Sequence, residues 1–232
     1  IQTAVYGCSY YSKEIMDPVY DSARPEHRQK YEILLAHGGD DRHIPMKVNQ
    51  IQSLGYDYVA MGHIHKPQEL VENHMAYAGA LEPIDINDTG THGYIEGRIS
   101  EKGCQIRFVC HASREYIHKD VQVHRAMTGH NLKQELVRMI EENGRQNMYK
   151  ITLTGFRDPD IWYDLEQMDP CGNVVEIVDH TKPAYDFEKL SNENKGNILG
   201  QYIESLKGYP QDSIEYQALC EGVQALMETR RG

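Results

Sequence analysis

Three histidines in the first third of the chain have the spacing of metal ligands. His63 and His65 stand two residues apart in the segment Gly62-His63-Ile64-His65, and His37 is followed by two glycines. Residues two apart in an extended segment project to the same side, so the paired imidazoles can each ligate a metal and can serve two adjacent ions. A pair of solvated loop histidines is the alternative that so short a motif leaves open.

The chemistry of these ligands indicates a transition metal without naming it. Neutral imidazole binds Zn, Mn, Fe, Ni or Cu. Hydrolysis by two metal ions normally also needs a carboxylate that bridges the ions. Three histidines without that carboxylate therefore predict an incomplete two-ion site.

Two apolar runs predict the strands that place these histidines. Tyr31–Ala36 ends at His37, and Tyr56–Met61 ends at the paired histidines. Apolar residues at helical spacing lie between the runs, and Gly55 ends this predicted helix: Ile44, Val48, Ile51 and Leu54. A strand, a helix and a strand form the βαβ unit of a parallel or mixed sheet, in which ligands gather beyond the carboxyl ends of the strands. We expect all three histidines to converge there.

The pattern changes after this unit. Three more strands are predicted at residues 75–78, 94–99 and 105–109, with a tight turn at 101–103. Partial alternation at 115–123, an amphipathic helix from Leu132 to Gly144, and strands at 149–153 and 173–178 then predict a small β-α-β domain. Two amphipathic helices follow, with apolar faces formed by Ile198, Leu199, Tyr202, Ile203 and Leu206 and by Ile214, Leu219, Val223 and Leu226.

Composition places the chain among ordinary globular proteins. It has 232 residues, 40% hydrophobic and 25% charged, and no run approaches the ~18 apolar residues of a membrane span. No signal peptide is recognisable, and the strand-like segment from Ile1 to Gly7 indicates a chain that begins inside a fold. The five cysteines are odd in number and form no C-x-x-C pair, which favours free thiols in a reducing cytoplasm.

The negative charge is concentrated near the C-terminus. Residues 158–232 hold 15 acidic and 6 basic side chains, net -9, whereas residues 1–157 hold 20 acidic and 18 basic, net -2. No dense stripe of Lys and Arg is present, so charge gives no independent case for tight DNA binding. The positive charge of bound metal ions could still attract a polyanion to residues 1–157, whose net charge is close to zero.

The motif order resembles a known family. The order of His37-Gly38, helix, Gly62-His63-Ile64-His65-Lys66-Pro67 and Tyr77-Ala78-Gly79-Ala80-Leu81-Glu82 is similar to the C-terminal portion of calcineurin-like metallophosphoesterases, more narrowly the SbcD-type DNA-repair exonucleases. Val5-Tyr6-Gly7-Cys8-Ser9-Tyr10 resembles the segment after the family's G-N-H-[DE] motif. Ala80 stands where the family usually has Ser.

The resemblance implies an α/β (α+β) chain in three parts. Residues 1–111 would be the C-terminal half of a metallophosphoesterase β-sandwich flanked by helices. Residues 112–182 would form a cap-like domain and residues 183–232 a helical tail. His37 and His63 would ligate one divalent ion and His65 a second, with manganese as the family's metal.

The same resemblance implies a metal-dependent exonuclease acting on DNA in repair, yet the sequence lacks D-x-H, G-D-x-x-D and G-N-H-[DE]. These motifs supply the bridging carboxylate and the general acid, so we assign no catalytic residue and expect the chain alone to be inactive. The substrate-binding residues stay unknown. Another phosphoesterase, acting on nucleotides or phosphoproteins, and a non-catalytic partner-binding fragment remain alternatives.

The resemblance also implies partners and leaves other residues with ordinary roles. The tail would contact an SbcC-like ATPase, a homodimer is the alternative, and no membrane is expected. We expect His43 to be an ordinary surface or packing residue, with an outer-shell contact to the metal as the alternative. Lys66 is expected to be solvated, and Tyr10 and Tyr11 are as consistent with packing as with substrate stacking.

Overall fold

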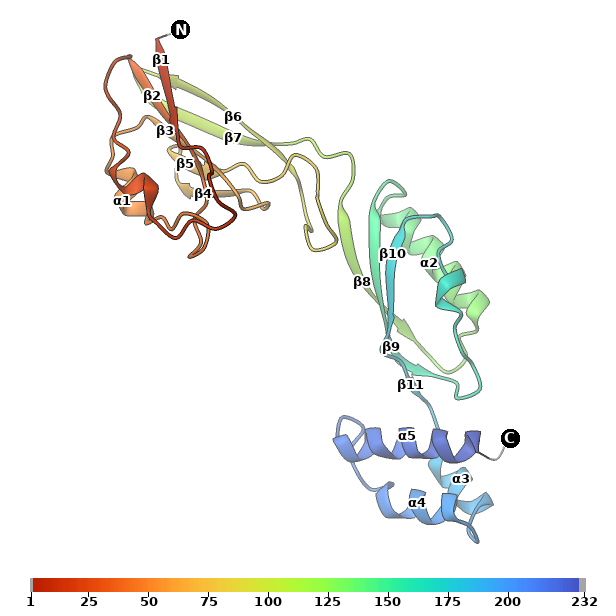
Figure 1. Ribbon diagram of the computed structural model, residues 1–232. Helices are drawn as coiled ribbons and strands as arrows, with labels where there is room; N and C mark the ends of the chain where they lie inside the picture. The colour runs from red at the N-terminus through yellow and green to blue at the C-terminus, as the bar shows by residue number, and fades with distance from the viewer. Residues whose placement is uncertain (1, 230–232) are drawn as a thin grey trace. The chain divides into compact units, whose positions relative to one another are not determined.

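The computed structural model describes residues 2–229 and is a mixed α/β structure with several sheets and five α-helices (Figure 1). It divides into two compact units, one of residues 1–117 with 146–148 and one of residues 118–145 with 149–232. Ile1, at which the first predicted strand began, and residues 230–232 of the predicted tail lie outside the described residues. The predicted three-part division stays a prediction.

A five-stranded sheet forms the centre of the first unit. Strands β1 (Thr3–Gly7), β2 (Tyr31–His37), β3 (Tyr58–Gly62) and β5 (Met75–Tyr77) pair in parallel, and β4 (Gln68–Val71) pairs with β5 in antiparallel orientation. The order β1-β2-β3-β5-β4 confirms the predicted mixed sheet. Strand β4 was not predicted, because Gln68 and Glu69 are polar and exposed and leave no apolar alternation to detect.

The helix between β2 and β3 is shorter than predicted. Helix α1 spans Val48–Gln52, so the prediction that it begins near Ile44 is wrong. Ile44 has a positive φ of 48° and precedes Pro45, which disfavours helical backbone at the residue before it. Ile44 is nevertheless 1% exposed, because it packs in the core from a loop rather than from a helix. The short 3-10 helix η1 (Val19–Ser22) was not predicted.

An antiparallel hairpin completes the first unit. Strands β6 (Gly93–Ser100) and β7 (Gly103–Cys110) pair throughout, and Ser100 opposite Gly103 confirms the predicted tight turn at residues 101–103. Gly103 has a φ of 105°, a conformation that glycine adopts without steric cost.

The second unit contains the predicted β-α-β stretch. Its sheet is built from β8 (Tyr116–Val123) and β9 (Met148–Arg157), whose first residues belong to the first unit, together with β10 (Val174–Asp179) and the two-residue β11 (Lys182–Pro183). The 3-10 helix η2 (Leu165–Gln167) precedes β10. Helix α2 (Gly129–Asn143) begins with a capping box of Thr128 and Asn131 and ends at Gly144. Its buried face is the predicted one: Leu132, Leu136 and Ile140.

Three helices follow the sheet: α3 (Phe187–Glu193), α4 (Ile198–Leu206) and α5 (Ile214–Glu228). Asp186, Asn197 and Ser213 cap their N-termini with side-chain oxygens. Most of the predicted apolar faces are covered within this bundle, whose buried centre is Leu199, Ile203, Leu219 and Val223. Ile198 and Ile214, at the first residues of their helices, are 68% and 83% exposed. Among the described residues, no helix combines the length and apolar character needed to cross a membrane.

Candidate metal centre

The parallel sheet brings two of the predicted ligands together. His37 is the last residue of β2 and pairs in register with Gly62, the last residue of β3. Because parallel strands end at the same edge, His63 follows directly beside His37. The ring centroids of His37 and His63 are 5.3 Å apart.

Glycines around these histidines make the close packing possible. A Cβ on Gly62 would lie 3.0 Å from Nδ1 of His37, and a Cβ on Gly38 would lie 2.1 Å from the carbonyl oxygen of His43. A Cβ on Gly39 would lie 2.0 Å from the hydroxyl of Tyr77, which donates a hydrogen bond to the carbonyl of Gly38 at 2.8 Å. A side chain at Gly38 or Gly39 would therefore force the loop after β2 to move, and one at Gly62 would press on the His37 imidazole.

His63 itself has strained backbone. Its φ is 101°, one of four positive φ values among the described non-glycine residues. Such conformations cost of order 1–3 kcal/mol and cluster at functional sites. The surrounding sheet holds the imidazole of His63 in a position that relaxed backbone would not give.

The loop after β2 adds two residues that the sequence did not assign to the site. Nε2 of His63 lies 2.7 Å from Oδ2 of Asp40, and Nδ1 of His43 lies 2.8 Å from Oδ1 of Asp40. The ring centroids of His43 and His63 are 4.4 Å apart. One potential ligand atom from each of Asp40, His43 and His63 lies within 4.8 Å of the other two. Two imidazoles and a carboxylate are a donor set that fits a divalent transition metal.

Strand-like bonds to a distant segment fix this loop. The amide of Ile15 donates to the carbonyl of Arg42 at 2.9 Å, and the amide of Ile44 donates to the carbonyl of Ile15 at 2.7 Å. Ile15 is 3% exposed and belongs to the core of the first unit. The segment around Ile15 thus sets where Asp40 and His43 lie. The signal in the sequence was the run Gly38-Gly39-Asp40, a carboxylate directly after a glycine pair.

The charges of the cluster suit cation binding. The hydrogen bond from His63 and the amide of Arg42 hold the pKa of the Asp40 carboxyl well below its usual range. Burial lowers the pKa of His37, and the neighbouring His63 and His43 lower it further. At neutral pH the cluster therefore contains a carboxylate anion and a neutral His37 imidazole, the forms in which these groups ligate metals.

His65 has a different partner. Its Nδ1 lies 3.0 Å from Oδ2 of Asp88, and the same oxygen accepts the amide of Ile84 at 3.0 Å. Burial alone would raise the pKa of Asp88, but the hydrogen bonds from Ile84, His65 and the Asp85 amide, together with the charge of His65, lower it. An ionised carboxylate only accepts hydrogen bonds, so Nδ1 of His65 carries the proton and Nε2 is free to ligate. No contact among the described residues joins the His65 ring to the Asp40 cluster, and its role as a metal ligand stays a prediction.

Tyr10 packs against the candidate site, whereas Tyr11 does not. The ring of Tyr10 lies edge-on to His37 with centroids 5.2 Å apart, and Tyr10 belongs to the partly buried shell of the core. Its hydroxyl oxygen is buried and has no hydrogen-bond partner among the described residues. Tyr11 is 71% exposed. A buried hydroxyl without a partner beside a histidine cluster is what an ion-bound water would satisfy.

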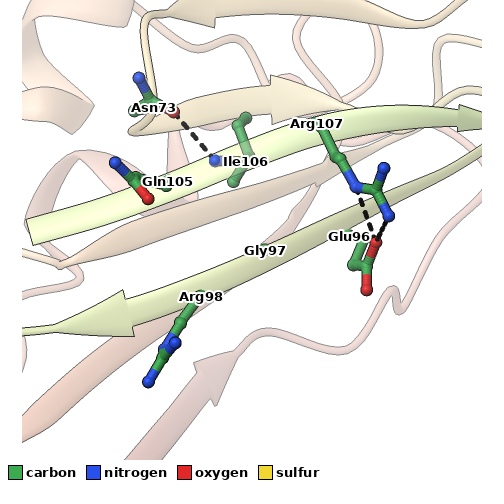
Figure 2. A pocket seen from close by; sticks show the side chains of 7 residues that line it. All are labelled: Asn73, Glu96, Gly97, Arg98, Gln105, Ile106 and Arg107. Atoms are coloured by element: carbon green, nitrogen blue, oxygen red, sulfur yellow. Dashed lines mark hydrogen bonds and ion pairs between the residues drawn. The ribbon is translucent and has the colours of Figure 1, made fainter.

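A hollow lies along the hairpin of β6 and β7. It has a volume of about 500 Å³ and is shallow and open, and its lining includes Asn73, Ile106 and Arg107 (Figure 2). Arg107 is paired with Glu96, and Asn73 accepts the amide of Ile106 at 2.9 Å. Arg98 is the third charged residue of the lining. The described residues of the lining include no histidine or other group of a metal site, so we place the chemistry at the histidines.

Comparison with known proteins gives one informative similarity. No family model matches the chain. A protein of Bacillus subtilis (strain 168), named as the uncharacterized metallophosphoesterase YhaO, is 32% identical over 99 residues. The match covers 39% of this chain and 24% of the relative, so the chain spans about a quarter of the length of the relative it matches. The similarity supports the metallophosphoesterase superfamily, whose members use divalent metals. It does not identify the SbcD-type exonucleases within that superfamily.

Proposed function

We propose that this chain is part of a metal-dependent phosphodiesterase that acts on DNA as a repair exonuclease. The observation that carries the proposal is the meeting of His37 and His63 at the carboxyl edge of the parallel sheet, with Asp40 and His43 beside them. The similarity to a metallophosphoesterase supports the same reaction class. The narrower assignment to exonucleases rests on the order of the sequence motifs.

The proposed arrangement gives each residue a definite task. His37 and His63 hold one divalent ion, His65 holds a second, and manganese is the proposed metal. Such ions, when bound, activate a water, hold the phosphate and stabilise its developing charge. Asp88 keeps the Nε2 of His65 free of a proton, and the glycines after β2 allow the loop to approach. A bridging carboxylate and a general acid would have to come from outside these 232 residues.

DNA is proposed as the substrate because of the second unit. The strands and helix from β8 to β10 have the pattern of the cap domain of the resembled nucleases. The first 157 residues carry a net charge of only -2, so bound cations could make the site attractive to phosphates. A nucleotide or a phosphoprotein is the rival substrate, and a non-catalytic role is the rival function.

The decisive assay uses a longer protein that combines this chain with D-x-H, G-D-x-x-D and G-N-H-[DE] segments. With manganese, we expect it to degrade end-labelled duplex DNA and to leave mononucleotides and phosphopeptides intact. Chelation should stop the reaction, and His63→Ala should reduce it to background. The 232-residue chain alone should show no nuclease activity with manganese, because the bridging carboxylate is absent.

The control variant is His124→Ala, which removes an exposed histidine of the second unit and should leave the rate unchanged. Hydrolysis of mononucleotides or phosphopeptides without DNA degradation would favour the rival substrates. Absence of any hydrolysis by the longer protein would favour the non-catalytic role. Robust DNA degradation by the 232-residue chain, abolished by His63→Ala, would contradict the proposed division of the site.

The helical tail is proposed to bind a protein partner, an SbcC-like ATPase. The net charge of -9 over residues 158–232 opposes binding to phosphates. Ile198 and Ile214 are exposed apolar residues on α4 and α5, and burying such surface against a partner is favourable. Ile198→Ser and Ile214→Ser should weaken binding to that ATPase without unfolding the bundle, whereas unchanged binding would remove the tail from the interface. A homodimer through the same residues would instead appear as concentration-dependent mass in sedimentation.

A further inference from the structure

We propose that Asp40, His43 and His63 bind one divalent transition-metal ion as a site of this chain's own, complete without any further segment. His63 is shared with the proposed hydrolytic centre, but Asp40 and His43 are additional ligands. The loop after β2 would therefore be a metal-binding loop rather than a connection. This inference does not rest on the proposed function, because it concerns binding by the chain alone.

The distances fit a single ion. Protein ligand atoms lie about 2.0–2.2 Å from a bound zinc, so two ligands of one ion are at most about 4.4 Å apart. One atom from each of Asp40, His43 and His63 lies within 4.8 Å of the other two. Side-chain shifts of a few tenths of an ångström would bring them to an ion. At present Asp40 accepts hydrogen bonds from both imidazoles. Binding would replace these bonds: Nδ1 of His43 and Nε2 of His63 would each give up the proton they now carry, and each neutral ring would keep one proton on its other nitrogen.

The donor set selects a class of metal. Two imidazole nitrogens and one carboxylate oxygen favour Mn, Fe, Co, Ni, Cu or Zn, whereas Mg and Ca prefer all-oxygen sites. Three protein ligands leave positions open for water or for a phosphate oxygen. The site therefore has the composition of a reactive centre more than that of a closed structural one.

The position of the ligands is built into the fold. The bonds of Ile15 to both sides of residue 43 tie the loop to the buried core. Gly38 and Gly39 bring it against Tyr77, which bonds the Gly38 carbonyl. The strained φ of His63 holds the third ligand from the other strand. The ligands are thus presented from two neighbouring strand ends in fixed register, which lowers the ordering cost of binding.

The nearby charges do not supply an alternative site. Asp41 and Arg42 on the same loop are exposed, and Nη1 of Arg42 lies 3.7 Å from Oε1 of Glu14. Asp40 is the carboxylate that faces both imidazoles, and Asp41 has the same charge one residue away. Asp41 therefore provides a matched control for the loss of a negative charge on this loop.

The test is titration of the metal-free 232-residue chain with cobalt chloride, followed by the visible absorption of bound Co²⁺ and by equilibrium dialysis. We expect one Co²⁺ per chain. Asp40→Asn and His43→Gln should each weaken binding about tenfold or more, whereas Asp41→Asn and the exposed His124→Ala should leave it unchanged. Thermal unfolding by circular dichroism confirms that each variant is folded.

Three results would overturn the inference. The first is the absence of saturable Co²⁺ binding by the folded chain. The second is unchanged binding in both Asp40→Asn and His43→Gln. The third is an equal loss in Asp41→Asn, which would mean that the charge of the loop, and not the ligand set, attracts the ion. Hydrolytic activity enters none of these outcomes, so failure here is separate from failure of the proposed function.

Discussion

Nε2 of His63 lies 2.7 Å from Oδ2 of Asp40, a contact that joins the end of β3 to the loop that follows β2. The two strand ends are neighbours in a parallel ladder, and the backbone bonds of the loop to Ile15 place Asp40 beside His63. The contact places a carboxylate beside the histidines at the edge of the sheet where ligands of α/β proteins gather. His63, the neighbouring His37 and the Asp40 loop therefore form one cluster.

The hydrogen bond between Asp88 and His65 predicts a fixed imidazole tautomer. The carboxylate of Asp88 accepts the Nδ1 proton of His65 at 3.0 Å. In Asp88→Asn the amide can donate instead of accept, so the population with a proton on Nδ1 should fall. Long-range ¹H–¹⁵N correlation spectra of the imidazole measure this population, and loss of such a partner typically weakens metal binding 10–100-fold.

Asp85→Asn is the control for that measurement. Asp85 is a nearby carboxylate that accepts the amide of Asn87 at 2.7 Å, and among the described residues the carboxylate bonded to His65 is that of Asp88. It should leave the His65 spectrum as it is. An unchanged His65 tautomer in Asp88→Asn would show that Asp88 has no positioning role.

Gly38 should tolerate no side chain. Its φ is 141°, and a Cβ would lie 2.1 Å from the His43 carbonyl oxygen. Gly55 also has a positive φ, 94°, but a Cβ there would meet no atom within 4 Å. Gly55→Ala should cost about 1–2 kcal/mol from backbone strain alone, and Gly38→Ala should cost more and also weaken metal binding. Urea unfolding gives both free energies, and equal losses would argue against the tight loop.

The helical bundle predicts that two isoleucines of α4 contribute very different amounts to the free energy of unfolding. Ile203 is fully buried, whereas Ile198 is 68% exposed. Ile203→Ala should lower the free energy of unfolding by about 2–5 kcal/mol, and Ile198→Ala should change it by less than about 0.5 kcal/mol. Thermal unfolding of the two variants makes the comparison. Similar effects of both changes would mean that the bundle is packed differently.

The five cysteines should differ in reactivity. Cys8, Cys110 and Cys171 are exposed, and Cys220 is buried. Burial raises the pKa of the Cys220 thiol, so less of it is the thiolate that reacts. Iodoacetamide at pH 8 followed by mass spectrometry should label the three exposed cysteines first and Cys220 only after unfolding. Early labelling of Cys220 would contradict the packing of α5.

Periodicity predicted the elements that have a strong one-sided pattern. Helix α2, with its three buried leucine and isoleucine positions and its Gly144 end, followed from the sequence. Helix α1 began four residues later than expected, because Ile44 satisfies the helical spacing while its backbone is fixed by Ile15 and Pro45. An apolar residue at helical spacing predicts that the side chain is buried, but it does not predict that the backbone is helical.

The candidate site could be predicted only where the strands determine it. His37 and His63 end neighbouring strands, so their meeting follows from the βαβ pattern. Asp40 and His43 reach the cluster through bonds of the loop to Ile15, a residue far away in the sequence. The spacing of residues along the chain cannot predict hydrogen bonds between distant segments. His43 was therefore expected to have an ordinary role. The assignment of His65 to a metal remains a prediction.

The most direct test of the central claim is a crystal structure of the chain grown with manganese, with anomalous diffraction measured at the manganese edge. The account predicts an anomalous peak bonded to His63 and within coordination distance of Asp40 and His43. A crystal of the folded chain saturated with manganese that has no peak at these histidines, or whose only peak lies elsewhere, would contradict it.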